Sequence, residues 1–289
     1  MSTATSTETA VSEARAADRR IERLRAIALN LRRHMITQAR GKGAGYLGQG
    51  LGFADFLAVL YFDEFEPHDL DFANADRRRF YLSTGHYSIA LWAVFAELGL
   101  IERELLPTYG ADESPLEMST MEGRLPGVEM TGGSLGHGLG IANGAALGYR
   151  IDARESTIHV ETSDGELQEG ATWESINTAA AFQLDNLVCW FDCNGIQADG
   201  PMVVPIEPLA DRLTAFGWAV KEIDGNDLAQ LLDAFEWARA RNGKPKGVIL
   251  RTHPGRGVKR IEARERAHFV RIDADEWDDV ARELEIENV

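Results

Sequence analysis

The chain has 289 residues, of which 44% are hydrophobic and 28 are glycine, and its formal net charge is −16. This size and composition predict a globular protein, and the negative charge argues against a nucleic acid or an anionic membrane as partner. The sequence has no apolar run near the ~18 residues of a membrane span and no evident secretory signal. Its only two cysteines, Cys189 and Cys193, share one apolar stretch, which excludes a disulfide framework and favours the cytoplasm.

The N-terminal part of the chain predicts a tail followed by a helical region. Residues 1–20 are rich in Ser, Thr and Ala and are expected to form a flexible tail that leads into a helix. Apolar side chains recur at helical spacing over 21–38, where the predicted domain of residues 21–289 begins. A Gly-rich loop is expected at 41–52, and the apolar run at 53–62 predicts a second helix.

The rest of the chain alternates between predicted strands and helices. After a short strand at 79–83 and a helix at 89–98, the Gly-rich stretch 130–148 is expected to begin as a turn and continue as a helix of small residues. The remaining strands are predicted at 157–162, 187–192, 218–223 and 247–252, and the remaining helices at 170–183, 207–216 and 227–241. This order predicts an α/β fold, a parallel sheet covered by helices on both faces, in one domain.

Acidic and amide side chains follow two of these strands. The strand at 157–162 leads to Asp164 in the stretch TSDGELQEGATWES, and the strand at 187–192 leads to Asn194. If the strands are neighbours, their ends lie roughly 5 Å apart. A carboxylate and an amide oxygen there suit Mg²⁺, and the glycine after Asp164 lets backbone N–H groups approach a phosphate. Two ordinary loop turns, Asp-Gly and Asn-Gly, would explain the same residues without a ligand.

The two motifs DGELQEGATWE and DCNGIQADG resemble the thiamine-diphosphate motif of the transketolase family, in particular of its split members. Further segments resemble the family in the expected order: ADFLAVLYF, RFYLSTGHYSIALWAVFAELG, PGVEMTGGSLGHGLGIANGAALG, EPLADRLTAFGWAVKEIDGND and KPKGVILRTHPGRGV. The resemblance covers nearly the whole chain and implies a diphosphate-domain fold that binds thiamine diphosphate and Mg²⁺.

The resemblance also implies roles for the matching residues. Mg²⁺ would be bound by the side chains of Asp164 and Asn194 and by the carbonyl oxygen of Ile196. Cofactor contacts and catalytic roles are implied for a larger set: His86 and His268 at the diphosphate and reacting centre, Gly133, Ser134 and Leu135 beside the cofactor, the amides of Gly165 and Glu166 at the diphosphate, and Glu169 and Glu174 at the subunit contact and the other active site.

The implied activity is transfer of a two-carbon ketol unit from a ketose donor to an aldehyde or carrier-linked acceptor. In the family, the glutamate that activates the cofactor lies in a pyrimidine-binding domain, and this chain resembles only the diphosphate-binding part. A second, C-terminal subunit is therefore expected, in an α₂β₂ assembly, and the chain is expected to be active only with it.

Three positions depart from the family pattern. Tyr46 stands where the family has a substrate-facing histidine, Ser119 stands near the place of a second one, and Ser163 replaces the glycine before Asp164. The metal and diphosphate residues match better than the sugar-facing ones, so the resemblance implies a non-standard substrate. Two other functions stay open: donation of a two-carbon acyl group to a lipoyl or carrier-protein thiol, and a non-catalytic regulatory or scaffolding role.

Overall fold

A parallel sheet forms the centre of the computed structural model, which describes residues 2–198 and 200–285. In these residues the sheet has five strands in the order β2–β3–β4–β8–β7, all parallel. The strands are β2 (Arg79–Leu82), β3 (Ile158–Ser163), β4 (Leu187–Cys193), β7 (Ala219–Asp224) and β8 (Lys246–Arg251). Each predicted strand is present to within a residue or so, and the α/β fold class is confirmed.

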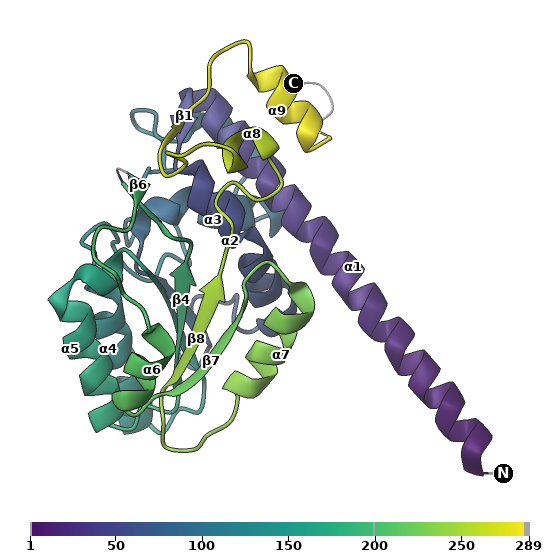
Figure 1. The fold of residues 1–289 in the computed structure, drawn as a ribbon, viewed down its shortest axis with the longest axis vertical. Helices are drawn as coiled ribbons and strands as arrows, with labels where there is room; N and C mark the ends of the chain where they lie inside the picture. Colours follow the sequence, from purple (N-terminus) through teal and green to yellow (C-terminus); the bar gives the residue numbers. More distant parts are fainter. Residues whose placement is uncertain (1, 199, 286–289) are drawn as a thin grey trace.

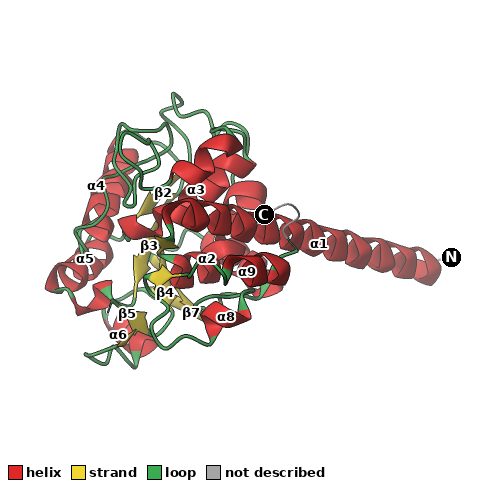
Figure 2. Ribbon diagram, turned by 90° about the horizontal axis from the view of Figure 1, so that it is seen from above, coloured by secondary structure: helices red, strands yellow, loops and turns green. Residues whose placement is uncertain are grey.

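Helices cover both faces of the sheet (Figures 1 and 2). One face carries α4 (Gly138–Ile151), α5 (Gly170–Ala181) and α6 (Leu209–Ala215). The other carries α1 (Ser2–Lys42), α2 (Leu47–Val59), α3 (Ser88–Glu97) and α7 (Leu228–Ala238). The two layers of side chains form two buried clusters, one on each side of the strands.

The central strand β4 shows why this sequence forms a doubly covered sheet. Its side chains alternate between the two buried clusters: Val188 and Trp190 face α2 and α7, whereas Leu187, Cys189 and Phe191 face α4 and α6. All are fully buried, as expected for a strand with a helix layer on each side. Cys189 is thus a core residue rather than a ligand or a disulfide partner.

The first helix is longer than predicted. The expected start was Ile21, but α1 begins at Ser2, and Figure 1 shows its N-terminal turns extending away from the sheet. The physical reason is local: residues 2–40 contain no glycine or proline, and Ala, Glu and Arg favour helix strongly. That residues 1–20 form a flexible tail outside a domain of residues 21–289 remains a prediction, and residues 286–289 lie outside the described part of the chain.

The Gly-rich segment 41–52 is not a loop throughout. After β1 (Ala44–Gly45), the helix α2 starts at Leu47, six residues before the predicted start. Its glycines allow close packing, because a Cβ at Gly48 would lie 2.1 Å from the carbonyl oxygen of Ala267. Tertiary contact therefore outweighs the low helix propensity of glycine here.

Several smaller elements join the helices and strands of this core. They are β5 (Ile196–Gln197), β6 (Gly200–Pro201), α8 (Lys259–Glu262), β9 (Val270–Arg271), α9 (Trp277–Glu283), a π-helical turn at Leu60–Glu64 and 3₁₀ turns at Gly85–Tyr87, Arg103–Thr108 and Glu166–Gln168. The strand β9 pairs antiparallel with β1, so distant parts of the chain meet there. Among the residues described, no helix has both the length and the hydrophobicity needed to cross a bilayer.

Candidate active site

The loops after β3 and β4 lie side by side, as the sequence predicts. The two strands are parallel neighbours, with Ser163 opposite Asp192. One residue further on, the amide of Asp164 donates to the carbonyl oxygen of Asp192 over 3.0 Å. The strand ends therefore bring Asp164 next to the turn that carries Asn194. This is the carboxyl end of the sheet, where ligands bind in open α/β folds.

Asp164 is a buried carboxylate with one oxygen left without a partner. Its exposed fraction is 1%. Oδ2 accepts a hydrogen bond from the amide of Gly195 over 2.7 Å, but Oδ1 has no hydrogen-bond partner among the described residues. Burial raises the pKa of Asp164 to about 7, because the charged form loses its water. A cation at Oδ1 would supply the missing partner and reverse this shift, so the site fits a metal ion.

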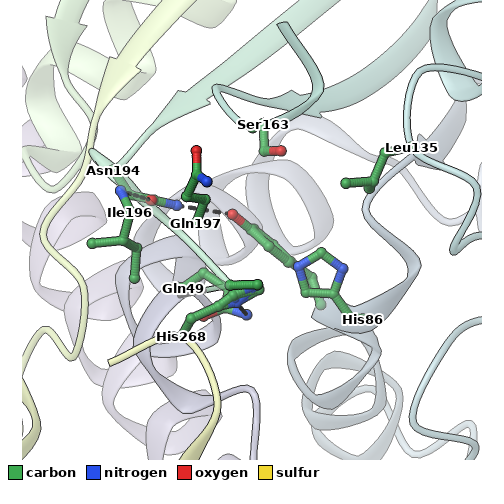
Figure 3. A pocket seen from close by; sticks show the side chains of 11 residues that line it. Gln49, His86, Leu135, Ser163, Asn194, Ile196, Gln197 and His268 are labelled. Carbon is green, nitrogen blue, oxygen red and sulfur yellow. Dashed lines mark hydrogen bonds between the residues drawn. The ribbon is translucent and has the colours of Figure 1, made fainter. Parts of the chain in front are cut away.

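Asn194 and Ile196 complete an oxygen-rich turn beside Asp164. The Asn194 side chain donates through Nδ2 to the hydroxyl of Tyr87 and to Asp192, each over 3.0 Å. Figure 3 shows Asn194 in place beside the pocket. Its Oδ1 accepts from the amide of Ile196 over 3.0 Å and keeps a second lone pair. No group of three His, Cys, Asp or Glu side chains in the described residues could hold a metal. The candidate ligands here are one carboxylate, one amide oxygen and one carbonyl oxygen, a set typical of Mg²⁺.

Ser163 and Glu166 form a reciprocal pair that shapes the loop after β3. The amide of Glu166 donates to Ser163 Oγ over 3.2 Å, and the amide of Ser163 donates to Glu166 Oε2 over 3.3 Å. This is the capping-box arrangement, and it gives a structural reason for Ser163 where the family has glycine. In this structure the amide of Glu166 donates to Ser163, and its contact with the diphosphate remains a prediction.

The Glu166 carboxylate is a structural feature that the sequence interpretation missed. It is fully buried, and Oε1 accepts from the hydroxyl of Ser83 over 2.6 Å and from the amide of Gly136 over 2.7 Å. It thereby joins the loops after β2 and before α4 to the loop after β3. The spacing of Ser163 and Glu166, three residues apart, is the signal that could have revealed part of this role.

A pocket opens between the turn that carries Asn194 and two histidines (Figure 3). It is lined by Gln49, His86, Tyr87, Leu135, Ser163, Gly165, Asn194, Ile196, Gln197, Ala198 and His268. Of the predicted site residues, His86, His268, Leu135, Gly165, Asn194 and Ile196 thus converge here. Gln49, Tyr87 and Ser163 also line the pocket, although the sequence assigned none of them a ligand contact.

The two histidines lie next to each other. Their ring centroids are 4.9 Å apart, although the residues are 182 positions apart in the chain. Burial, with a smaller effect of the neighbouring His268, lowers the pKa of His86 to about 3. His86 is therefore neutral at physiological pH and offers one N–H donor and one acceptor nitrogen to the pocket.

Tyr46 and Ser119, the predicted substrate residues, lie close to the histidine pair in the chain fold. The Tyr46 ring centroid is 4.9 Å from that of His86 and 5.4 Å from that of His268. Ser119 Oγ is buried without a hydrogen-bond partner among the described residues, and a Cβ at Gly85, the residue before His86, would lie 2.4 Å from it.

The remaining predicted residues lie outside the pocket. Gly133 and Ser134 lie in the loop before α4, and only their neighbour Leu135 lines the cavity. Glu169 and Glu174 are exposed at the start of α5, and Glu174 borders a separate groove between α4 and α5. Their predicted role at a subunit contact remains a prediction.

The chain matches one protein family over most of its length. Residues 19–288 match the family described as "Transketolase, thiamine diphosphate binding domain". A putative uncharacterized transketolase family protein of Sinorhizobium fredii is 46% identical over 260 residues, which cover 88% of this chain and 92% of the relative.

Two further relatives are named as transketolase subunits. The 6-deoxy-6-sulfo-D-fructose transketolase subunit of a Clostridium species is 35% identical, over 89% of this chain and 95% of its own length. The apulose-4-phosphate transketolase subunit of Actinobacillus succinogenes is 35% identical, over 89% of this chain and 93% of its own length.

Solved structures share the fold but are longer. Transketolase from Leishmania mexicana superposes with a TM-score of 0.82 at 26% identity, covering 91% of this chain and 41% of the longer one. More than half of that enzyme therefore has no counterpart in this chain.

Proposed function

The chain belongs to the transketolase family, and on that premise we propose that it is the diphosphate-binding subunit of a split transketolase that transfers a two-carbon ketol unit from a ketose to an acceptor. The relatives named as subunits support this proposal, since they are matched over 93% and 95% of their length, whereas the Leishmania mexicana transketolase is matched over 41%. The observation that carries it is the buried Asp164: its Oδ1 has no hydrogen-bond partner among the described residues, and its Oδ2 accepts from the amide of Gly195, the residue after Asn194.

We propose that Mg²⁺ binds to Asp164 Oδ1, Asn194 Oδ1 and the carbonyl oxygen of Ile196. The unpartnered oxygen of Asp164 supports this placement, because a buried carboxylate is stable in its charged form only with a cation or hydrogen-bond donors. The Gly165 backbone lines the same pocket, and the absence of a side chain there lets a diphosphate approach closely.

Thiamine diphosphate, when bound, supplies the carbon nucleophile that attacks the ketose. The chain's own residues would hold and shield it. His86 is neutral and buried, so it can donate a hydrogen bond without carrying a charge into the pocket. Leu135 and Ile196 provide apolar walls that keep water away from the reacting centre.

We infer a ketose other than the usual pentose phosphates as donor. Tyr46 stands where the family has a histidine and Ser119 stands near the place of a second one; Tyr46 packs against His86, and Ser119 lies beside Gly85, the residue before it. The related subunits are named for a sulfonated deoxy sugar and for apulose 4-phosphate, so this branch of the family includes unusual sugars.

The proposed partner is a second subunit that carries the pyrimidine-binding domain, in an α₂β₂ assembly in the cytoplasm. The exposed Glu169 and Glu174 are the acidic side chains we assign to that contact. Both cysteines are unpaired thiols in the core, which suits a reducing compartment.

The test is the affinity of the assembled complex for thiamine diphosphate, titrated by calorimetry in the presence of Mg²⁺. Replacing Asp164 with Ala removes the charged ligand, so we expect the affinity to fall by at least about 100-fold, at the upper end of what loss of supporting groups costs at metal sites. Asp211→Ala, at an exposed acidic position on α6, is the matched control and should bind as the natural chain does. Unchanged cofactor affinity in Asp164→Ala would refute the metal site.

A further inference from the structure

Two backbone links tie the start of α2 to the segment that carries His268. Gly45 of β1 pairs with Val270 of β9, and the amide of Gly48 donates to the carbonyl oxygen of Ala267 over 3.0 Å. The second link is close enough that a Cβ at Gly48 would lie 2.1 Å from that oxygen. The next residue in each segment, Gln49 and His268, is therefore held in a fixed position relative to the other.

The side chains of these two residues are in contact inside the pocket (Figure 3). Gln49 Nε2 lies 3.4 Å from His268 Nδ1, and both residues line the cavity beside His86. Gln49 is only 2% exposed, yet its Oε1 is buried without a hydrogen-bond partner among the described residues. A buried acceptor without a hydrogen bond is destabilising, so a ligand group that donates a hydrogen bond to it gains affinity.

We propose that Gln49 is a positioning and specificity-determining residue, whose amide nitrogen sets the tautomer of His268 and whose amide oxygen accepts a hydrogen bond from a hydroxyl group of the ketose. The inference rests on the proposed function, since it assigns the sugar to this pocket. Gln49 directly follows the Tyr46–Gly48 segment, and it is not one of the residues that we propose as ligands of Mg²⁺ or of the diphosphate.

The tautomer of His268 follows from the fact that Gln49 Nε2 is a hydrogen-bond donor. Gln49 Nε2 carries hydrogens only, so it bonds to Nδ1 of His268 when that nitrogen has its lone pair free. In neutral His268 the proton then resides on Nε2, which makes that nitrogen a donor to oxygen atoms in the pocket. The opposite orientation of the Gln49 amide would reverse both roles, and the first experiment below distinguishes the two.

The chemical group that binds here follows from the fact that Gln49 Oε1 is a hydrogen-bond acceptor. An amide oxygen needs a donor, and ionised phosphate or sulfonate groups have none, so the anionic end of a sugar or the diphosphate cannot satisfy Oε1. A hydroxyl group can. A site built to bond a hydroxyl discriminates strongly against an analogue that lacks it, because the buried acceptor then stays unpaired.

The first experiment determines the tautomer of His268 by long-range ¹H–¹⁵N NMR on the full chain labelled at histidine, with the signals of His268 assigned from His268→Gln. We expect the proton on Nε2 in the natural chain. Gln49→Glu replaces the donor with a second acceptor, so the proton should move to Nδ1. A natural chain with the proton on Nδ1 overturns the proposed role. This measurement requires no activity.

The second experiment compares ketose donors with analogues that lack one hydroxyl, using the complete two-subunit enzyme. Gln49→Met keeps the length of the side chain and removes its polar atoms. For the ketose that keeps all its hydroxyl groups, we expect kcat/KM of Gln49→Met to fall about 10–100-fold, the effect of losing one buried hydrogen bond to a substrate. For the deoxy analogue that lacks the hydroxyl bound by Gln49, we expect kcat/KM to change little. Affinity for thiamine diphosphate should stay within about threefold of the natural value.

Gln49→Glu restores an acceptor and should recover part of the preference for the hydroxylated donor, even if Gln49→Met folds poorly. An equal loss for all donors, or no loss, overturns the specificity role. If the natural complex transfers no two-carbon unit from any ketose, the proposed function fails instead, and the NMR result still decides the contact with His268.

Discussion

At the scale of single residues, burial changes the protonation of the side chains that meet at the pocket. The pKa of Asp164 is raised to about 7 and that of His86 is lowered to about 3, in both cases mainly because burial disfavours the charged form. Because it is neutral, His86 can donate one hydrogen bond and accept another. Asp164 is the opposite case: a pKa of about 7 leaves its carboxyl group partly protonated at neutral pH, and a bound cation would favour the charged form.

Tyr46 packs against the histidine pair, and we expect it to contact the substrate. We expect Tyr46→His to change the preference among ketose donors, or the turnover rate, by about tenfold or more, because phenol and imidazole differ by about 3.5 pKa units. Cofactor affinity should change little. Steady-state kinetics with a panel of ketoses and calorimetric titration of the cofactor measure the two effects.

Tyr46→Phe is the matched control, since it keeps the ring that packs 4.9 Å from both His86 and Phe269. If Tyr46→His behaves like the natural chain with every donor, Tyr46 does not contact the substrate.

At the scale of elements, close packing around glycines holds the site together. Gly48 lies where α2 contacts the backbone of Ala267, whereas a Cβ at Gly144 in α4 would have nothing within 4 Å. Gly48→Ala should lower the free energy of unfolding by about 1–3 kcal/mol, as overpacking does. Gly144→Ala should raise it by about 0.5–1 kcal/mol, because alanine is the better helix former.

Urea unfolding of the two variants measures this difference. The same substitution in two helices then separates close backbone approach from helix propensity. Equal effects at both positions would show that the contact between Gly48 and Ala267 is not tight.

The strand β3 contains a buried histidine that should limit stability in acid. His159 is 2% exposed, accepts a hydrogen bond from Trp190 Nε1 and has its pKa lowered to about 3, mainly by burial. The unfolded chain therefore binds more protons than the folded one between about pH 3 and 6.5, so stability is present above about pH 6.5 and is lost as the pH falls.

At about pH 5 this residue should reduce the free energy of unfolding by about 2 kcal/mol relative to about pH 7. In His159→Gln, the free energy of unfolding should therefore fall by about 2 kcal/mol less between about pH 7 and about pH 5 than in the natural chain. Urea unfolding at both pH values measures this difference. His68→Gln, at a side chain that is 52% exposed, is the control and should keep the full decrease. The same pH dependence in His159→Gln and the natural chain would contradict the assignment.

At the scale of the whole molecule, we expect the pocket to be one side of a larger site. This chain aligns with 41% of the Leishmania mexicana transketolase structure, and the described surface carries exposed apolar side chains such as Phe269, Val203 and Val204. Exposed apolar side chains that gather near a site are typical of surfaces that bind another protein.

We therefore expect this chain alone to show no two-carbon transfer above background. The cofactor would lack the activating glutamate, and a site open to water loses the electrostatic gain of a closed one. Ketose-dependent transfer is assayed for this chain, for its partner and for their mixture, and only the mixture should turn over. Full activity of this chain alone would refute the split enzyme.

The sequence alone determined the strands, the order of the helices and the positions of Asp164 and Asn194. Those features depend on local patterns: apolar runs bounded by turns, and polar residues directly after them. It also located Tyr46, Ser119 and Ser163 as departures, because each falls inside a recognisable segment. The start of α1 and the helical part of the Gly-rich segment 41–52 were predicted wrongly.

Only the tertiary structure showed that Gln49 contacts His268, that the Glu166 carboxylate joins three loops, and that Asp164 Oδ1 has no partner among the described residues. Gln49 and His268 are 219 residues apart, and no local pattern encodes their contact. It depends on how closely two backbones approach at Gly48, and such an approach is set by packing over the whole fold.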